Sequence, residues 1–118
     1  MAAPESTLFV LIPVHNRCAV THRCLEQLRV QAPCNLVVVV VDDGSSDGTG
    51  AMLRSFGGLS IEVVEGDGSL WWGGAVTAGM QHIDRRAGEA DRVLLLNDDV
   101  DLPSDFLARM LAASDAEP

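Results

Sequence analysis

The sequence has few basic residues. Eight Lys and Arg stand against 17 Asp and Glu, which gives a formal net charge of −9. An acidic chain repels nucleic acid and anionic membrane surfaces, so we expect neither as a main partner. Because the protein's own charge opposes an anionic ligand, such a ligand would need a metal ion beside it.

Long apolar segments are also missing. The longest aliphatic run, residues 36–41, is far shorter than the roughly 20 residues that span a bilayer. The first residues lack the basic region and apolar stretch of a secretory signal. We therefore expect a soluble, cytoplasmic protein without a transmembrane segment.

Several familiar binding motifs are absent. Cys18, Cys24 and Cys34 are odd in number and form no Cys-x-x-Cys pair, so neither a disulfide framework nor a zinc knuckle is indicated, and we expect buried or neutral thiols. The histidines lack the His-x-x-x-His spacing of a helical metal site. Neither Gly-x-x-x-x-Gly-Lys nor Gly-x-Gly-x-x-Gly occurs, which makes ATPases and ordinary dehydrogenases poor candidates.

The chain does contain enough hydrophobic residues to form the core of one domain, since they make up 47% of its 118 residues. We expect a single domain over residues 1–118, with flexible ends at 1–6 and 114–118. Apolar runs typical of buried strands cover residues 8–12, 36–41, 61–64 and 92–96. Helical spacing covers residues 20–31, 52–56, 75–83 and 106–111. This alternation predicts a Rossmann-like three-layer α/β/α fold with a mostly parallel sheet of about four strands.

Acidic side chains follow two of the predicted strands where each strand ends. Asp42 and Asp43 come after the second strand, and Asn97, Asp98 and Asp99 come after the fourth. The carboxyl ends of strands are where ligands bind in open α/β sheets. Adjacent carboxylates at a buried strand end repel each other, so we expect a ligand role for at least one of Asp42 and Asp43. The following Ser46, Asp47 and Thr49 suit helix capping.

The segment 97–101 has two interpretations. Its carboxylate oxygens are the ligands that Mg²⁺ and Mn²⁺ prefer, and such an ion would bridge the phosphates of a nucleotide. Alternatively, the segment is a solvated acidic turn before a last helix capped by Ser104.

Trp71 and Trp72 lie in a glycine-rich segment, residues 66–74, that we expect to be a loop. The chain has only these two Trp, three Phe and no Tyr. Indole faces commonly pack against sugars or bases. The alternative is that one indole fills the core where the loop crosses the sheet.

Three segments together resemble the nucleotide-binding half of family 2 glycosyltransferases, which have the GT-A fold. They are residues 12–17 (IPVHNR), 40–49 (VVDDGSSDGT) and 95–100 (LLNDDV), and their order and spacing are those of the family. Residues 66–75 are similar to the branch that contains rhamnosyltransferase-like enzymes. The resemblance covers about residues 7–111, the first half of a typical family domain. We therefore expect a truncated chain whose fourth strand is left as a sheet edge.

The resemblance implies a donor site and a metal. The residues that it assigns to the nucleotide sugar are Pro13, Val14, His15, Asn16, Arg17, Asp42, Asp43, Gly73 and Asp98. Asp43 or Asp42 would accept a hydrogen bond from the base, and Asp98 would contact the ribose. Asp99 would bind Mn²⁺ or Mg²⁺ as the last carboxylate of the Asp-x-Asp motif, whose first position is Asn97 here. Asp101 lies outside the motif and has no assigned ligand role.

The implied reaction is a metal-assisted, inverting transfer from a UDP-, dTDP- or GDP-sugar to an unknown sugar, lipid or protein acceptor. The general base is expected in the missing C-terminal half, so we expect this chain alone to bind nucleotide weakly and to transfer nothing. Two alternatives stay open, a nucleotidyltransferase-like enzyme and a non-catalytic nucleotide-binding α/β module. The former usually has a glycine-rich basic loop after its first strand, whereas residues 13–17 have no glycine and one basic side chain.

Overall fold

The computed structural model describes residues 6–31 and 35–116, in which four strands form one parallel sheet. The strands are β1 (Thr7–Val14), β2 (Asn35–Asp43), β3 (Ser60–Gly66) and β4 (Arg92–Leu95), in the order β3-β2-β1-β4. The predicted α/β fold is confirmed. Cys34 and the outermost predicted ends, residues 1–5 and 117–118, lie outside the described residues.

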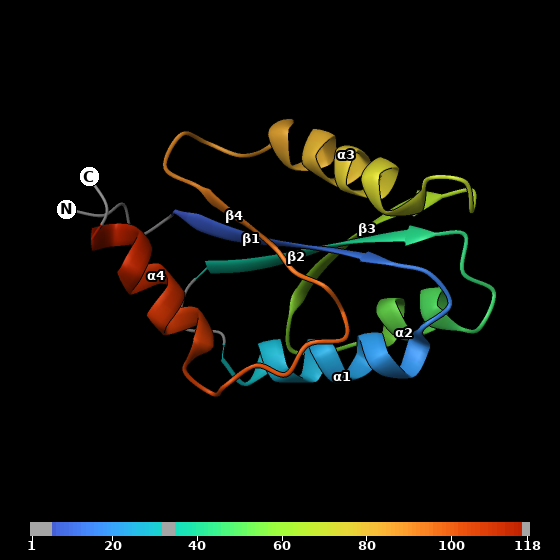
Figure 1. Ribbon diagram of the computed structural model, residues 1–118, viewed down its shortest axis with the longest axis horizontal. Helices are drawn as coiled ribbons and strands as arrows, with labels where there is room; N and C mark the ends of the chain where they lie inside the picture. Colours follow the sequence, from blue (N-terminus) through green and yellow to red (C-terminus); the bar gives the residue numbers. More distant parts are fainter. Residues whose placement is uncertain (1–5, 32–34, 117–118) are drawn as a thin grey trace.

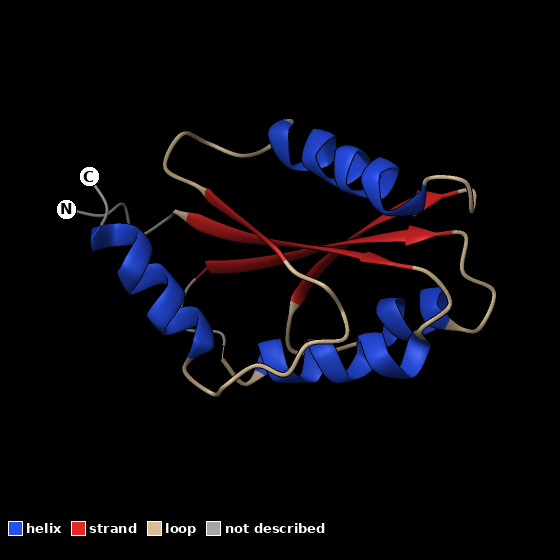
Figure 2. Ribbon diagram, viewed as in Figure 1, coloured by secondary structure: helices blue, strands red, loops and turns tan. Residues whose placement is uncertain are grey.

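Four helices cover the two faces of the sheet (Figures 1 and 2). They are α1 (Cys18–Arg29), α2 (Thr49–Ser55), α3 (Trp71–Asp84) and α4 (Phe106–Ala116). Helix α3 lies on one face, and α1 and α2 lie on the other. Leu107 of α4 belongs to the same buried cluster as the apolar side chains of α1. The result is the expected three-layer arrangement.

The central strands are buried on both faces because their sequences are almost continuously apolar. Side chains alternate along a strand, so Val38 and Val40 of β2 join the cluster on the α1 side, while Val39 and Val41 join the cluster on the α3 side. The same alternation separates Asp42 from Asp43.

Helix boundaries differ from the sequence predictions in three places. Helix α1 ends at Arg29, and Gln31, which the periodicity placed in the helix, instead accepts a hydrogen bond from Leu107 N at 2.8 Å. Helix α3 begins at Trp71, so residues 71–74 form its first turn and not a loop. Helix α4 continues through 114–116, which were expected in a flexible end.

Strand β4 is an edge strand of the described sheet, as expected, because it pairs with β1 alone. Leu94 packs into the cluster on the α1 side, and Val93 and Leu95 are exposed on the opposite face. No helix among the described residues has both the length and the apolar character needed to cross a membrane.

The chain changes direction between β1 and β4. Successive strands β1, β2 and β3 are added on one side, and β4 then returns to the other side of β1. Right-handed crossovers place α1 and α2 on one face and α3 on the other. The carboxyl ends of β1 and β4 therefore form a topological switch point, where ligands bind in open α/β sheets.

Gly79 allows α3 to lie directly on the sheet. A Cβ atom built at Gly79 would overlap Leu11 Cδ1 and lie 3.0 Å from Val41 Cγ2. Leu11 is fully buried, so its side chain can move aside only by displacing its close-packed neighbours. We predict that Gly79→Ala lowers the free energy of unfolding by about 1–3 kcal/mol, because overpacking outweighs the better helix propensity of alanine.

Gly73 provides the matched control for urea denaturation. It lies in the same helix, and a Cβ atom built there meets nothing within 4 Å. Gly73→Ala should leave stability unchanged or raise it. Equal stability of the two variants would contradict the close packing of α3.

Candidate functional site

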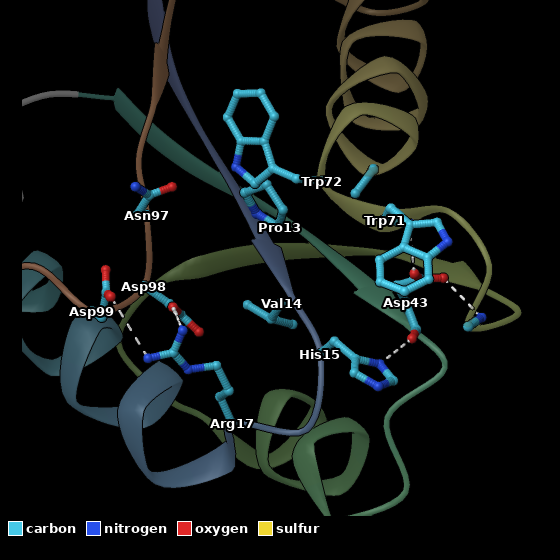
Figure 3. A pocket seen from close by; sticks show the side chains of 12 residues that line it. Pro13, Val14, His15, Arg17, Asp43, Trp71, Trp72, Asn97, Asp98 and Asp99 are labelled. Carbon is cyan, nitrogen blue, oxygen red and sulfur yellow. Dashed lines mark hydrogen bonds and ion pairs between the residues drawn. The ribbon is translucent and has the colours of Figure 1, made fainter.

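A cavity of about 470 Å³ opens at the carboxyl ends of β1, β2 and β4 (Figure 3). Its volume is in the range of small-molecule sites. Predicted site residues in its lining are Pro13, Val14, His15, Arg17, Asp43, Asp98 and Asp99. The lining also includes Gly68, Trp71, Trp72, Ala75 and Asn97. Segments distant in sequence thus meet at the switch point.

The remaining predicted residues, Asn16, Asp42 and Gly73, are not part of this lining. Asp42 faces the α1 side of the sheet, where its Oδ1 accepts a hydrogen bond from Ser45 N at 3.2 Å. Asn16 joins two loops, since its backbone N donates to Ser45 Oγ at 2.8 Å and its Oδ1 accepts from Ser46 N at 2.7 Å. The structure gives Asp42 and Asn16 local contacts that hold the loops beside the cavity.

The buried carboxylate of Asp43 fixes the start of α3. Its Oδ1 accepts a hydrogen bond from Gly68 N at 2.8 Å, and its Oδ2 accepts from Leu70 N at 3.0 Å and Trp71 N at 3.1 Å. Backbone N–H groups at a helix N-terminus favour a negative charge. Asp43 therefore caps a helix that follows it by more than 25 residues, a contact that no local sequence pattern signals.

Gly44 lets the same loop approach β2. Its φ of +70° lies in the left-handed region, and a Cβ atom there would lie 2.7 Å from Gly68 N. A side chain at position 44 would push the 66–70 loop away from the Asp43 carboxylate.

His15 also contacts Asp43, through the backbone. Its Nδ1 lies 2.5 Å from the Asp43 carbonyl oxygen, and its Nε2 lies 3.4 Å from Asn16 Nδ2. A carbonyl only accepts, so Nδ1 carries the proton and Nε2 accepts from the amide. The imidazole is thus held by two partners at the cavity wall.

Arg17 neutralises the acidic end of the cavity. Its Nη1 lies 3.6 Å from Asp98 Oδ1, and its Nη2 lies 3.7 Å from Asp99 Oδ2. Asp98 is buried, and burial raises the pKa of its carboxyl, an effect that Arg17 and a hydrogen bond from Thr21 partly offset. The pair of carboxylates is therefore stabilised by a cation from the loop after β1.

Thr21 is a site residue that sequence reasoning missed. Its hydroxyl is buried and donates to Asp98 Oδ2 at 3.1 Å. The available signal was a polar side chain within the apolar stripe of α1, three and four residues before Cys24 and Leu25. Cys24 beside it is fully buried, as expected, and burial raises the pKa of its thiol to about 11.

Gln27 anchors the segment that follows Asp99. Its Nε2 donates to the Val100 carbonyl at 3.1 Å, and its Oε1 accepts from Leu102 N at 2.5 Å. The acidic turn is therefore tied to α1 by backbone contacts on both sides of Asp101. Asp101 itself forms an exposed ion pair with Arg23.

Asp47 is a capping residue, as its position predicted. Its Oδ2 accepts from Cys18 N at 3.0 Å, at the start of α1, and its Oδ1 accepts from Thr49 N at 3.2 Å. The hydroxyl of Thr49, and then the N–H of Cys18, lower the pKa of the Asp47 carboxyl. The loop after β2 thus caps two helices.

Neither tryptophan fills the core. Trp71 is 81% exposed and Trp72 is 57% exposed, and both line the cavity. Trp71 also has a left-handed backbone with a φ of +58°, which is rare for a bulky side chain. Sequence reasoning left core and ligand roles open, and the exposure removes the core role.

A divalent cation fits this site only together with a ligand. Among the described residues, no three His, Cys, Asp or Glu side chains gather to hold a metal ion. Asp99 is 55% exposed at the cavity and offers one carboxylate. Mg²⁺ is commonly held by one or two carboxylates, substrate phosphates and water, so Asp99 suits an ion that binds with a diphosphate.

The cap formed by Asp43 can be tested by Asp43→Asn. We predict a loss of about 1.5–3 kcal/mol in the free energy of unfolding, because an amide replaces a charged acceptor of three N–H groups. The control is Asp67→Asn in the same loop. Asp67 is exposed and, among the described residues, accepts hydrogen bonds from Ser69, so Asp67→Asn should lower the free energy of unfolding by less. A similar loss in both variants would contradict the special role of Asp43.

Comparisons with known proteins agree with the fold. The structure is similar to the mannosyltransferase PcManGT from Pyrobaculum calidifontis in complex with GDP-Man and Mn²⁺, with a TM-score of 0.80, 25% identity, and coverage of 100% of this chain and 35% of that chain. It is also similar in fold to S. aureus TarS, with a TM-score of 0.75, 24% identity, and coverage of 92% and 32%.

The chain therefore spans about a third of the length of these two proteins. No curated protein matches its sequence. The family profile described as Glycosyl transferase family 2 matches residues 9–118, almost the whole chain. The chain belongs to glycosyl transferase family 2.

Proposed function

We propose that this chain is the donor-binding part of a metal-assisted, inverting glycosyltransferase that uses a nucleoside-diphosphate sugar. The observation that carries the proposal is the cavity at the switch point, where Asp43 lies toward one end and Asp98 and Asp99 lie at the other. Family membership supports sugar transfer, and the similar mannosyltransferase is described with GDP-Man and Mn²⁺.

The Asp43 end of the cavity suits the base. A carboxylate offers about four acceptor positions, and backbone N–H groups take three of those of Asp43. The remaining position can accept an N–H of a base. Because the carboxylate is already fixed by the loop, binding costs little further ordering.

The Asp98 and Asp99 end suits the ribose and the diphosphate. Thr21 and Arg17 hold the buried Asp98 in place, so its oxygens are preorganised for a ribose hydroxyl. Asp99 would hold Mn²⁺ or Mg²⁺. When bound, the ion supplies charge stabilisation to the departing diphosphate. The Arg17 guanidinium, which pairs with both carboxylates, would help to balance the negative charge of the diphosphate.

The acceptor side of the reaction is proposed from the family alone. The similar structures are about three times longer than this chain. The general base and the acceptor site, whether for a sugar, a lipid or a protein, are proposed to lie in residues beyond this chain. The rhamnosyltransferase-like branch stays a prediction from residues 66–75. We accordingly expect the 118-residue chain to show no sugar transfer. Detectable transfer by the purified chain would contradict the proposed location of the general base and the acceptor site.

Titration calorimetry with UDP, dTDP and GDP tests the donor site. We expect one diphosphate to bind in the presence of Mn²⁺ and to bind much more weakly without it. Asp99→Ala should weaken the metal-dependent binding by about tenfold or more, because the ion loses its protein ligand. Asp101→Ala is the matched control, since Asp101 is an acidic neighbour that pairs with Arg23 outside the cavity.

Three results would point elsewhere. A preference for triphosphates over diphosphates favours a nucleotidyltransferase. Nucleotide affinity that changes neither with Mn²⁺ nor in Asp99→Ala favours a non-catalytic module. An equal loss in Asp99→Ala and Asp101→Ala would indicate a general effect of surface charge and not a metal site.

A further inference from the structure

We propose that Trp71 is a specificity-determining residue that stacks on the base of the bound nucleotide. The inference rests on the proposed function and goes beyond it, because it assigns base recognition to an aromatic platform on α3. It follows from the exposure of Trp71, from its backbone conformation and from its place at the Asp43 end of the cavity.

The exposure of Trp71 is the first step. A side chain of this size is usually among the more buried ones, yet 81% of Trp71 is open to solvent. Its indole lines the cavity and not a distant surface. A planar ligand in the cavity can therefore cover an apolar face that the described fold leaves bare.

The backbone at Trp71 gives an independent indication. A left-handed φ of +58° is unfavourable for any residue with a Cβ atom, and glycine would adopt it freely. Two hydrogen bonds to Asp43 Oδ2, from Leu70 N and Trp71 N, hold the strained turn in place. Strain of this kind persists where the surroundings fix it, and it gathers at ligand sites. Tryptophan at this position is therefore costly for folding and is accounted for by a ligand.

The position of Trp71 favours a contact of its indole with the base and not with the phosphates. Figure 3 shows the Trp71 indole beside Asp43, on the side of the cavity away from Arg17 and Asp99. The backbone N of Trp71 lies 3.1 Å from Asp43 Oδ2, and the His15 ring contacts the Asp43 carbonyl. A base that donates to the free acceptor position of Asp43 lies within reach of the indole face. Trp72 lies closer to Pro13 in the same view.

The experiment uses calorimetry and melting temperature on three variants of the 118-residue chain. Trp71→Gly removes the indole and relieves the left-handed backbone, and Trp71→Phe keeps an aromatic face. Met80→Ala is the matched control, because Met80 is a 41% exposed apolar side chain on the same helix, outside the cavity. The ligands are the diphosphate that the parent chain binds best with Mg²⁺, and inorganic pyrophosphate.

We expect Trp71→Gly to melt at or above the temperature of the parent chain while its nucleotide affinity falls by about 5- to 150-fold, the range of one base stacked on an aromatic ring. Trp71→Phe should retain most of the affinity, and Met80→Ala should retain all of it. Pyrophosphate binding should be the same in every variant, because it has no base.

Fluorescence gives a second readout, because the chain has two Trp and no Tyr. In Trp72→Phe, Trp71 is the only indole. We expect the nucleoside diphosphate with Mg²⁺ to quench its emission, and neither pyrophosphate nor a free monosaccharide to do so. Quenching by the monosaccharide alone would make Trp71 a sugar platform and overturn the proposal.

The outcomes separate the two proposals. If the parent chain binds a diphosphate and Trp71→Gly binds it equally well, base stacking is wrong and the donor site stands. If Trp71→Gly loses affinity for pyrophosphate as well, the change has disturbed the whole cavity and stacking is overturned. If the parent chain binds no diphosphate, the proposed function fails and the stacking proposal fails with it.

Discussion

The geometry of the cavity depends on the buried carboxylate of Asp43. Three backbone N–H groups from residues 68–71 converge on it, so the end of β2 determines where the 66–70 loop runs and where α3 begins. That helix then lies across β1 and β2, with Gly79 against Leu11 and Val41. Because a charged acceptor satisfies several otherwise unpaired helix N–H groups at once, one residue couples the sheet, the loop and the aromatic wall of the cavity.

A second constraint is the balance of charge at the other end of the cavity. Asp98 and Asp99 lie side by side in a chain with a net charge of −9, and Arg17 bridges both. Arg17 comes from the loop after β1, so the central strand supplies the cation and the edge strand supplies the anions. The side chain of Gln27 holds the acidic segment through hydrogen bonds to the backbone of Val100 and Leu102. The pair of carboxylates is thus kept in a fixed place, where a divalent ion and a diphosphate have complementary charge.

Much of the fold could be predicted from the sequence, because it depends on the pattern of apolar residues within each strand and helix. The continuous apolar runs of β1 and β2 and the helical stripe of α1 need no knowledge of distant residues. The start of α3 could not be predicted, because its capping group is Asp43, far away in the chain. Within the candidate site, the acidic strand ends indicated Asp43, Asp98 and Asp99. Alternation along β2 places Asp42 and Asp43 on opposite faces, but which of the two faces the cavity depends on the side that α3 covers. The role of Thr21 depends on the packing of α1 against the last loop.

The most direct test of the donor site is an NMR measurement of paramagnetic broadening on the ¹⁵N-labelled chain, with its preferred nucleoside diphosphate and a trace of Mn²⁺. The account predicts that the backbone signals of residues 97–99 and Arg17 broaden most, with weaker broadening at Asp43, and that omitting the nucleotide removes the effect. Broadening centred on exposed acidic residues outside the cavity lining, such as Asp84 and Glu89, or equal broadening without nucleotide, would contradict a metal-diphosphate site at the switch point.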